Sequence, residues 1–508
     1  MNKTTQPTPA WAVAVAALPT EWFRAARWFQ AKAAAVRSIR LVDILDLSSL
    51  LPPGSRRLSI ALVEVAAGDG SPELYQLPLC LEPDGGMGPG PSFAVGAGWT
   101  VREALEEPAL HAVMIRLMSE GRTLAGGRGT FHFESFPSSL WRQVHPLAQN
   151  STNSLMLVKA DVVCKFIRRL PAGQSPELEM NRIFAAAGTF QNLAPLEGAL
   201  SYRDAGGREY TLVITRRYVE NQGDLWHGTL SFLSHWLHLL AETGPETSTE
   251  PAREDALNYL DRVRRLAKVL AMMHRTLSAE GLGAAFAPEP ITPADLAHWS
   301  GAMAAGAVAV LDKLAAREPG SNPATRDVPE ELPEMRRQIL AAFSRLTGLR
   351  PDGWIKCRVH GDFHLGQILL VGDDCFVMDF EGEPLKAAAQ RVAKYSPLKD
   401  VAGLLRSFHY AMCAALYDWK ERHPLPREAF NALECRLAEW NRSVEQIFRE
   451  TYFAEMGWIE NAGLSEFLAV LKLEKAVYEL DYEINNRPAW LPIPSSGIRA
   501  CLKEILQT

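Results

Sequence analysis

Residues 359–383 hold the pattern that most constrains the fold of this chain. The stretch begins VHGDFHLGQILL and ends CFVMDFEGE, so two apolar runs alternate with polar residues. Asp362 is followed five residues later by Gln367, and Asp379 stands twelve residues further on, at the end of an apolar run. Short apolar runs bounded by Gly, His and Asp predict short strands and turns. We therefore expect a loop, short strands and turns here, with Asp379 at a strand end.

A carboxylate, a carboxamide and a second carboxylate in this order are typical of phosphoryl transfer from ATP. Mg²⁺ is a hard ion that prefers oxygen ligands, so Gln367 and Asp379 are the predicted metal ligands. The attacking group in such a reaction is a neutral hydroxyl, and Asp362 suffices as the base that orients and deprotonates it. The motif predicts a kinase-like site that uses ATP and Mg²⁺.

Such a site also needs a lysine to hold the phosphates and a carboxylate to orient that lysine. Lys165 lies in the apolar run VVCKFI, which predicts a strand, and Glu179 lies fourteen residues on in a predicted helix. We expect these two to pair, although Glu177 shares the helix. Arg168 and Arg169 are expected at a solvated edge of the same sheet. A polar turn before the hairpin is predicted to cover the phosphates with Ser151, Thr152, Asn153 and Ser154.

Length and composition predict a globular protein of several units. The chain has 508 residues, 47% of them apolar and 22% charged, which leaves room for about two to four domains. Strand-like runs dominate residues 1–92, a small sheet with one or two helices is expected over 93–222, and helical spacing dominates 223–508. We predict an α+β, bilobal, kinase-like fold with these three parts.

Several elements are specific enough to test. Alternating or continuous apolar runs predict strands over 39–46, 58–65 and 74–80. The stretch 99–116 is expected to be a helix. Four prolines within 318–334 predict a long exposed connection.

Charge, hydropathy and cysteine usage exclude other classes. Lys and Arg total 53 and Asp and Glu total 59, so the net charge of −6 provides no global footprint for nucleic acid. The longest early apolar run, residues 11–18, is far shorter than the roughly 20 residues of a spanning helix, so we expect no membrane segment. The seven cysteines are widely spaced without a CxxC pair, which disfavours disulfides and thiolate metal sites. We therefore expect a cytoplasmic protein.

The sequence resembles the bacterial maltokinases, aminoglycoside-phosphotransferase-like kinases that phosphorylate the anomeric hydroxyl of maltose. The motifs that carry this resemblance are HGDFHLGQILL, VMDFEGEP, SPLKDVAGLLRSFHYA and EKAVYELDYEINNRPAWLPIP. Weaker matches include ARWFQAK, QNSTNS, VCKFIRRL and YVENQGDLW, so the resemblance spans nearly the whole chain and includes the family's N-terminal cap. Two departures are WFQAKAA, where the family usually has WFGGKGR, and His409, where it usually has an acidic residue.

The resemblance implies roles for individual residues. Asp362 is implied to be the catalytic base, with Gln367 and Asp379 binding Mg²⁺ and Lys165 with Glu179 forming the ion pair at the phosphates. The implied hinge that receives adenine through its backbone consists of Arg217, Tyr218 and Val219.

A second set of residues is expected to bind the acceptor. Spacing places Lys475, Tyr478 and Glu479 on one helix face, and charged groups beside aromatic rings suit a saccharide wall. The alternative is a purely structural helix. Glu381 and Glu383 are expected to orient Arg391, Lys394 or the substrate, or else to form a local salt bridge. His360 is expected to be a structural hydrogen-bonding residue. The predicted acceptor residues are His364, Glu381, Arg406, Lys475, Tyr478, Glu479 and Trp490.

The resemblance implies that the product is maltose 1-phosphate, formed from trehalose-derived maltose for α-glucan synthesis. It implies small-molecule partners, with a trehalose synthase as a candidate protein partner and a monomer or a dimer as the assembly. A related kinase for glucosamine, glucose or an aminoglycoside uses the same catalytic parts, because the acceptor pocket and not the fold determines the substrate. A nucleotide-binding pseudokinase is the alternative outside the enzymes.

Overall fold

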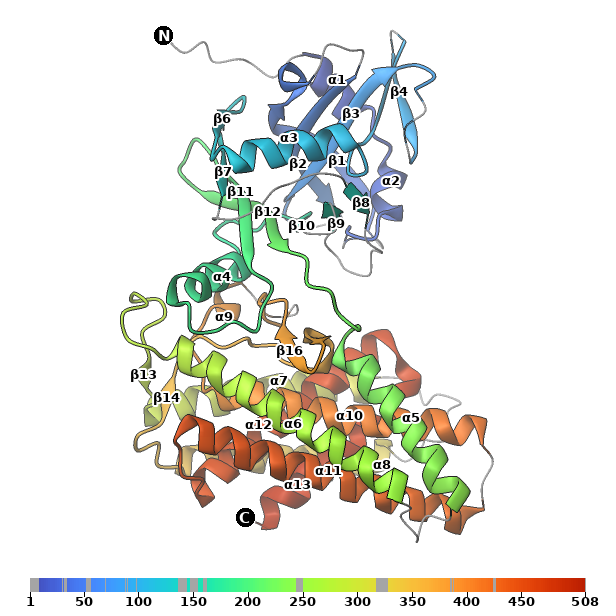
Figure 1. Cartoon of the computed structure of the whole chain (residues 1–508), viewed down its shortest axis with the longest axis vertical. Helices are drawn as coiled ribbons and strands as arrows, with labels where there is room; N and C mark the ends of the chain where they lie inside the picture. Colours follow the sequence, from blue (N-terminus) through green and yellow to red (C-terminus); the bar gives the residue numbers. More distant parts are fainter. Residues whose placement is uncertain are drawn as a thin grey trace. The chain divides into compact units, whose positions relative to one another are not determined.

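The computed structural model divides into two compact units, which are described separately (Figure 1). The first unit comprises residues 1–185 and 194–219, and the second comprises residues 186–193 and 220–508. Ser151, Thr152 and Asn153 of the predicted phosphate turn lie outside the described residues. The structure describes residues 9–29, 31, 34–51, 56–68, 70–86, 88, 90–96, 98–135, 144–146, 154–158, 162–243, 250–316, 328–383, 386, 388–423 and 426–507.

The first unit begins with a five-stranded antiparallel sheet in the order β1-β2-β3-β5-β4. Its strands are β1 (Val36–Asp46), β2 (Arg57–Ala67), β3 (Glu73–Pro83), β4 (Ser92–Gly96) and β5 (Trp99–Glu103). The strands predicted over 39–46, 58–65 and 74–80 are confirmed. Helices α1 (Pro9–Ala16) and α2 (Thr20–Ala25) bring Trp11 and Phe23 onto the sheet, where both side chains are fully buried.

The helix expected over 99–116 is wrong in its first part. Residues 99–103 form β5 instead, because Val101 pairs with Leu81 on β3 and is buried in the sheet. The helix, α3 (Pro108–Ser119), begins with a proline in its first turn, where the backbone needs no N–H donor. Long-range strand pairing therefore overrides the local preference.

A second, seven-stranded sheet follows in the order β6-β7-β11-β12-β10-β9-β8. One apolar core joins the two sheets, since Leu58 and Ile60 of β2 pack in the same cluster as Met114 of α3 and Phe166 of β10. The strands are β6 (Thr123–Ala125), β7 (Thr130–Ser135), β8 (Val144–Pro146), β9 (Ser154–Val158), β10 (Val162–Phe166), β11 (Leu196–Arg203) and β12 (Glu209–Arg217). Helix α4 (Pro176–Ala187) carries both candidate partners of Lys165.

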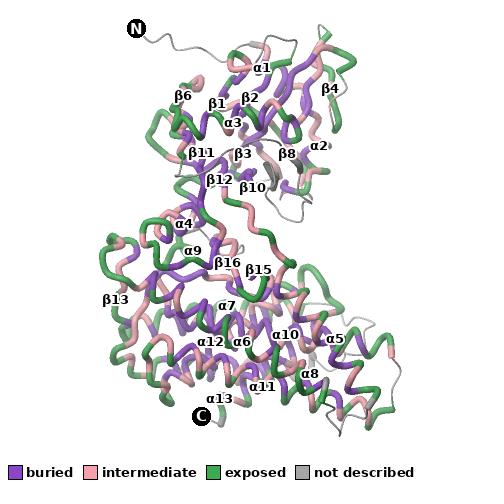
Figure 2. Tube along the Cα trace, viewed as in Figure 1, coloured by how far each residue is buried: buried purple, intermediate pink, exposed green. Residues whose placement is uncertain are grey.

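The second unit is mainly helical, and buried residues run along the inner faces of its helices (Figure 2). Two small two-stranded antiparallel sheets are inserted. One pairs β13 (Glu289–Pro290) with the distant β14 (Ile355–Lys356), and the other is the hairpin of β15 (Ile368–Val371) and β16 (Asp374–Val377). The helices are α5 (Leu225–Thr243), α6 (Glu250–Leu277), α7 (Pro293–Ala315), α8 (Val328–Ser344), α9 (Ala388–Arg391), α10 (Leu398–Arg422), α11 (Arg427–Met456), α12 (Ala462–Asn486) and α13 (Pro492–Gln507).

The long connection expected over 318–334 is shorter than predicted. Helix α8 begins at Val328, so Pro329 lies in its first turn and Pro333 lies inside it. Leu332, Met335 and Ile339 recur at helical spacing and are buried, and burial of this apolar face outweighs the lost hydrogen bond of the internal proline. Across the part of the chain that the structure describes, no helix combines the length and apolar character needed to cross a membrane.

Candidate active site

The loop that contains Asp362 is fixed through its backbone by a buried carboxylate. Asp400, in the first turn of α10, accepts hydrogen bonds from the amides of His360 at 2.7 Å and Gly361 at 2.9 Å. His274 of α6 lies 3.1 Å from the same carboxylate. The side chains of Asp400, His360 and His274 are all buried. These contacts hold the loop that presents Asp362 in place. The sequence expectation did not include Asp400, although it lies within the segment SPLKDVAG.

A short hairpin places the two predicted metal ligands at one end. Strands β15 and β16 pair Ile368 with Val377, and the amide of Met378 donates to the carbonyl of Gln367 at 2.9 Å. Gln367 and Asp379 therefore flank the same end of the hairpin. Asp379 has a φ of +60°, a conformation that residues other than glycine rarely adopt.

The same end of the hairpin is tied to the loop. The imidazole of His360 bonds through Nε2 to the carbonyl of Met378 at 2.8 Å, which confirms that His360 is a structural hydrogen-bonding residue. The carboxamide and carboxylate of Gln367 and Asp379 are the oxygen donors that a Mg²⁺ ion requires. The residues therefore fit a magnesium site.

Asp362 forms an ion pair with Lys475 of α12, whose Nζ lies 2.8 Å from Oδ1. Burial alone would raise the pKa of Asp362, but the charge of Lys475, with smaller effects of the neighbouring histidines, holds it well below its usual range. The pKa of Lys475 is held above its usual range, since its carboxylate partners outweigh burial. Asp362 is thus ionised at neutral pH and can accept a proton.

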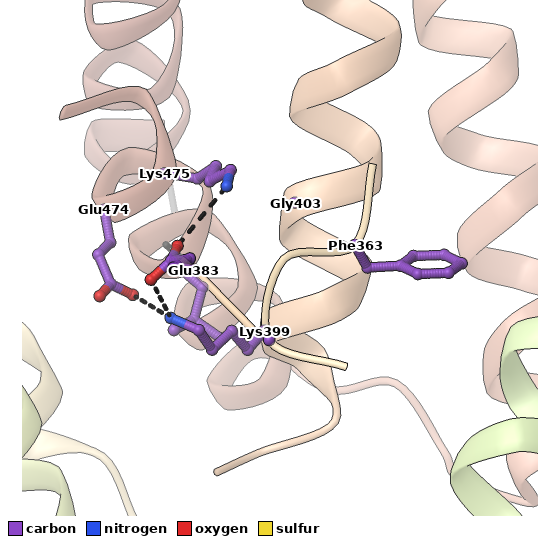
Figure 3. A pocket seen from close by; sticks show the side chains of 8 residues that line it. Phe363, Glu383, Lys399, Gly403, Glu474 and Lys475 are labelled. Carbon is purple, nitrogen blue, oxygen red and sulfur yellow. Dashed lines mark ion pairs between the residues drawn. The ribbon is translucent and has the colours of Figure 1, made fainter. Parts of the chain in front are cut away.

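The ion pair continues into an alternating chain of charges (Figure 3). Lys475 lies 3.6 Å from Glu383, Glu383 lies 3.8 Å from Lys399, and Lys399 lies 3.7 Å from Glu474. Lys386 also pairs with Glu383, at 2.6 Å. The structure gives Glu383 salt bridges, one of its expected roles, with Lys386, Lys399 and Lys475. A small cavity beside this chain is also lined by Gly361, Phe363, Gly403 and Leu471.

His364 presents one ring nitrogen toward the catalytic carboxylate. Its Nδ1 accepts a hydrogen bond from the amide of Gly366 at 3.1 Å, and its Nε2 lies 3.9 Å from Oδ2 of Asp362. Burial lowers the pKa of His364 despite the opposing effect of Asp362. The ring is therefore neutral at pH 7, with its proton on Nε2, where it can donate to an acceptor oxygen.

Arg406 and Glu479, both predicted to bind the acceptor, instead bind each other. Their closest atoms lie 2.6 Å apart, and Arg406 is only 2% exposed. The guanidinium fills the space beside Gly497 of α13, where a β-carbon would lie 2.3 Å from Nη2. We therefore correct the expectation for Arg406, because a side chain packed between three helices does not present its charge to a substrate. Glu479 neutralises that buried charge.

An aromatic surface lies on the same side of α10 and α12. The rings of Tyr410 and Trp490 stack with centroids 6.1 Å apart, and Trp226 of α5 lies 6.0 Å from Tyr410. Arg487 lies over Trp490 at 4.6 Å, and Lys475 lies over Tyr478 at 4.4 Å. Aromatic faces beside fixed polar groups are suited to binding a saccharide. The sequence analysis had singled out Trp490 and Tyr478 but not Trp226 or Tyr410.

In the first unit, Lys165 pairs with Glu177. Its Nζ lies 2.7 Å from Oε2 of Glu177, and Arg216 of β12 contacts the other oxygen of that carboxylate. Glu177 is 1% exposed, so this carboxylate holds two cations inside the unit. The structure favours Glu177, the alternative on the same helix, as the orienting carboxylate. The pairing of Glu179 with Lys165 stays a prediction.

Two other predicted nucleotide residues lie at the ends of strands in this sheet, Arg217 in β12 and Ser154 in β9. Arg217 ends β12, its amide donates to the carbonyl of Pro195 at 2.8 Å, and its guanidinium pairs with Glu197. The reception of adenine by Arg217, Tyr218 and Val219 stays a prediction. Ser154 is buried at the start of β9, and its hydroxyl accepts from Arg168 at 2.8 Å, which places it at the base of the hairpin.

The expectation of a solvated edge is wrong for Arg168. This residue is 1% exposed, because Glu103 and Trp28 of the N-terminal segment cover it. Arg169, by contrast, pairs with Glu73 at the surface.

A larger cavity, of about 310 Å³, lies elsewhere in the second unit. Trp354, Trp458 and Asn461 are among its lining residues, and none of the residues predicted from the sequence lines it. The candidate site is therefore defined by its chemistry and not by the volume of a cavity.

Comparison with known proteins finds relatives for the N-terminal part and for nearly the whole chain. Residues 22–109 match the family model of the maltokinase N-terminal cap domain. Over 475 residues the chain is 24% identical to a glucosamine kinase of Streptacidiphilus jiangxiensis, a match that covers 92% of this chain and 98% of the relative. A glucosamine kinase of Mycolicibacterium smegmatis is 25% identical over 380 residues, covering 74% of this chain and 84% of the relative.

Solved structures show the same fold. A glucosamine kinase in complex with glucosamine, ADP and inorganic phosphate matches with a TM-score of 0.65 at 21% identity, covering 98% of this chain and 99% of that one. A second crystal form of glucosamine kinase matches with a TM-score of 0.67 at 21% identity, covering 97% and 100%.

The fold, the site and these relatives define an ATP-dependent phosphotransferase of the sugar or aminoglycoside kinase class. Its substrates are a nucleotide and a small molecule. Within that class the chain resembles the maltokinases in its N-terminal part, where residues 22–109 match their cap domain, and it is similar to glucosamine kinases over most of its length.

Proposed function

We propose that this chain transfers the γ-phosphoryl group of ATP to the anomeric hydroxyl of maltose, giving maltose 1-phosphate. The observation that carries the proposal is the ionised carboxylate of Asp362, whose side chain is 14% exposed, in a loop that leads into the hairpin flanked by Gln367 and Asp379. The resemblance to maltokinases and the matching cap domain support maltose as the acceptor.

Asp362 orients the acceptor hydroxyl and accepts its proton, while His364 donates through Nε2 to a neighbouring acceptor oxygen. The acceptor hydroxyl shares Oδ1 of Asp362 with Lys475. The positive charge of Lys475 then stabilises the negative charge that develops at the reacting oxygen atoms. Lys165, oriented by Glu177, binds the phosphates. Gln367 and Asp379 hold Mg²⁺, which supplies charge neutralisation at the phosphates when it is bound.

The charge balance around Asp362 supports a neutral acceptor. Figure 3 shows Glu383 and Glu474 with Lys399 and Lys475. With Asp362 and Lys386 included, the cluster holds three carboxylates and three lysines, and each carboxylate has a lysine partner. On α12, Glu479 and Glu483 are paired with arginines. A cationic amino sugar would meet Lys475 beside the catalytic base, and like charges at such a distance repel each other.

The aromatic surface supports an acceptor longer than one sugar ring. The buried ring of Tyr410 packs against the partly exposed rings of Trp226 and Trp490, with centroids 6.0 Å and 6.1 Å away. We infer that the second glucose unit of maltose packs on this surface while the first presents its anomeric hydroxyl to Asp362.

Glucosamine is the second candidate acceptor, because two sequence relatives that cover most of the chain are glucosamine kinases. An ADP-release assay with Mg-ATP against maltose, glucose, glucosamine, trehalose and kanamycin separates the candidates. Selective activity on maltose, with the phosphate at C1 by NMR, is the expected result. Activity on glucosamine with maltose silent would overturn the acceptor assignment and keep the catalytic residues. ADP binding without turnover of any acceptor would favour a pseudokinase.

A further inference from the structure

Two buried side chains connect the N-terminal cap to the hairpin that carries Lys165. The first is Gln76 of β3, which is fully buried. Its Nε2 donates to the carbonyl of Ile167 at 2.8 Å and also to the carbonyl of Leu212, while its backbone amide donates to the carbonyl of Arg168 at 2.9 Å. A cap residue therefore supplies three hydrogen bonds to the end of the seven-stranded sheet.

These carbonyls mark the place where the β10–β12 ladder ends. Lys165 pairs with Ile214 in that ladder, and the last rung is the hydrogen bond from the amide of Ile167 to the carbonyl of Leu212, at 2.8 Å. The side-chain amide of Gln76 donates one N–H to the carbonyl of Ile167, just after β10, and the other to the carbonyl of Leu212 in β12, and so bridges the two strands. Its Oε1 is buried and has no hydrogen-bond partner among the described residues. Reversing the amide would set Oε1 against two carbonyl oxygens, so the donor orientation is fixed.

The second connection is Arg168. Its Nε donates to Oγ of Ser154 at 2.8 Å, and its Nη2 pairs with Glu103 of β5. The guanidinium also lies 5.2 Å from the ring centroid of Trp28. Because Ser154 pairs with Phe166 across the β9–β10 hairpin, Arg168 holds the start of β9 and Gln76 holds the end of β10. Both contacts join the cap to the same end of one hairpin.

The spacing of β10 and β12 also determines the phosphate-binding pair. Glu177 receives Lys165 from β10 and Arg216 from β12, one on each carboxylate oxygen. A change in the separation or register of the two strands therefore moves two cations relative to one buried carboxylate. Ion pairs at hydrogen-bonding distance tolerate only small displacements, and a misplacement of about 1 Å in a catalytic or binding site can greatly reduce the reaction rate.

We propose that Gln76 and Arg168 are positioning residues through which the cap sets the β9–β10 hairpin, and with it Lys165, for nucleotide binding. The inference rests on the proposed function in one respect, namely that Lys165 binds the phosphates of ATP. The cap is then part of the nucleotide-binding lobe in a functional sense.

Gln76→Met tests this, because it keeps the length of the side chain and removes both donors. We expect the KM for ATP and the Kd for ADP to rise about 3- to 10-fold, while kcat at saturating ATP and the KM for the acceptor stay within about twofold. Arg168→Met should raise the same two constants. Glu73→Gln is the matched control, since Glu73 lies on the same strand and pairs with Arg169 on the surface of the same two segments. That control should leave both constants unchanged.

An unchanged Kd for ADP in a folded Gln76→Met protein with a lowered Tm would overturn the proposal and assign the contact to stability alone. If Gln76→Met does not fold, Gln76→Asn retains the amide but is too short to bridge both carbonyls. Failure of both to fold would equally assign Gln76 to stability. The Kd for ADP is measured by calorimetry without acceptor. Its result therefore stands even if no tested sugar is phosphorylated, an outcome that counts against the proposed acceptor alone.

Discussion

Asp362 and Lys475 are 113 residues apart in the sequence, and their side chains meet with Nζ 2.8 Å from Oδ1. This pair joins the catalytic loop to helix α12, which also carries Tyr478 of the predicted acceptor residues. Lys475 is therefore placed to act on both substrate binding and the protonation state of the base. The pair makes the pH dependence of the reaction a direct test of the site.

Replacing Lys475 with methionine should shift the acid limb of the pH profile. In the native protein Lys475 holds the pKa of Asp362 below its usual value, so the carboxylate stays ionised as the pH falls below neutral. Without that charge, burial dominates and raises the pKa of Asp362. We therefore expect kcat/KM of Lys475→Met to fall at a higher pH than in the native enzyme, in addition to a loss of activity at its optimum.

Lys475→Arg keeps the positive charge and should restore the position of the acid limb even if the maximal rate stays low. The contribution of the Asp362–Lys475 pair to the free energy of unfolding also depends on pH. A depressed carboxylate pKa contributes stability above the unfolded value near 4, and that contribution is lost as pH falls through the folded value. If the acid limb were identical in Lys475→Met and the native protein, protonation of Asp362 would not be the cause of the activity loss at low pH.

Asp362→Asn should remove the base while leaving nucleotide binding intact. We expect kcat to fall by about 10²- to 10⁴-fold, the usual contribution of a positioned base, with the Kd for ADP changed by less than about twofold. Asp352→Asn is the control, because Asp352 is exposed and lies in the segment that precedes the same loop. Near-native turnover of Asp362→Asn would move the role of base to another residue.

The sequence predicts much of this site because its parts are local. Gln367 and Asp379 flank one hairpin made of two four-residue strands. The apolar runs between fixed polar positions are sufficient to predict this hairpin. The partner of Asp362 is not predictable in this way, because it lies 113 residues away and depends on how α12 packs. Arg168 was misassigned for a similar reason, since the residues that cover it come from the cap. Glu177 and Glu179 lie two residues apart on one helix, and only the packing of α4 distinguishes their directions.

The two candidate metal ligands should differ in strength. A carboxylate contributes charge as well as an oxygen, so Asp379→Asn should raise the Mg²⁺ concentration needed for half-maximal activity by more than Gln367→Leu does. We expect this Mg²⁺ concentration to rise more than about tenfold for Asp379→Asn and more than about threefold for Gln367→Leu. It is measured at fixed ATP with free Mg²⁺ varied. The exposed Gln191→Leu is the control for the loss of a carboxamide in the same unit. An unaltered Mg²⁺ dependence in both variants would place the metal elsewhere.

Trp490→Ala should weaken acceptor binding without affecting the nucleotide. Trp490 stacks with Tyr410 and carries Arg487 on its face, and loss of an aromatic contact of this kind is worth about 1 kcal/mol or more. We expect the KM for maltose to rise at least about fivefold, with the KM for ATP unchanged. A smaller effect with glucose than with maltose would support contact of this surface with the second sugar unit. Equal effects on both acceptors would place the surface at the first unit.

Glu177→Gln and Glu179→Gln together decide which carboxylate orients Lys165. Glu177 is buried and contacts both Lys165 and Arg216, so its neutralisation leaves two cations without their counter-charge. We expect Glu177→Gln to raise the KM for ATP about tenfold and to lower the free energy of unfolding by up to about 3 kcal/mol. Glu179→Gln should change both quantities far less. The measurements are initial rates over a range of ATP concentrations and denaturant unfolding of each variant. The reverse ranking, with Glu179→Gln the more damaging, would restore the pairing that the sequence resemblance favours.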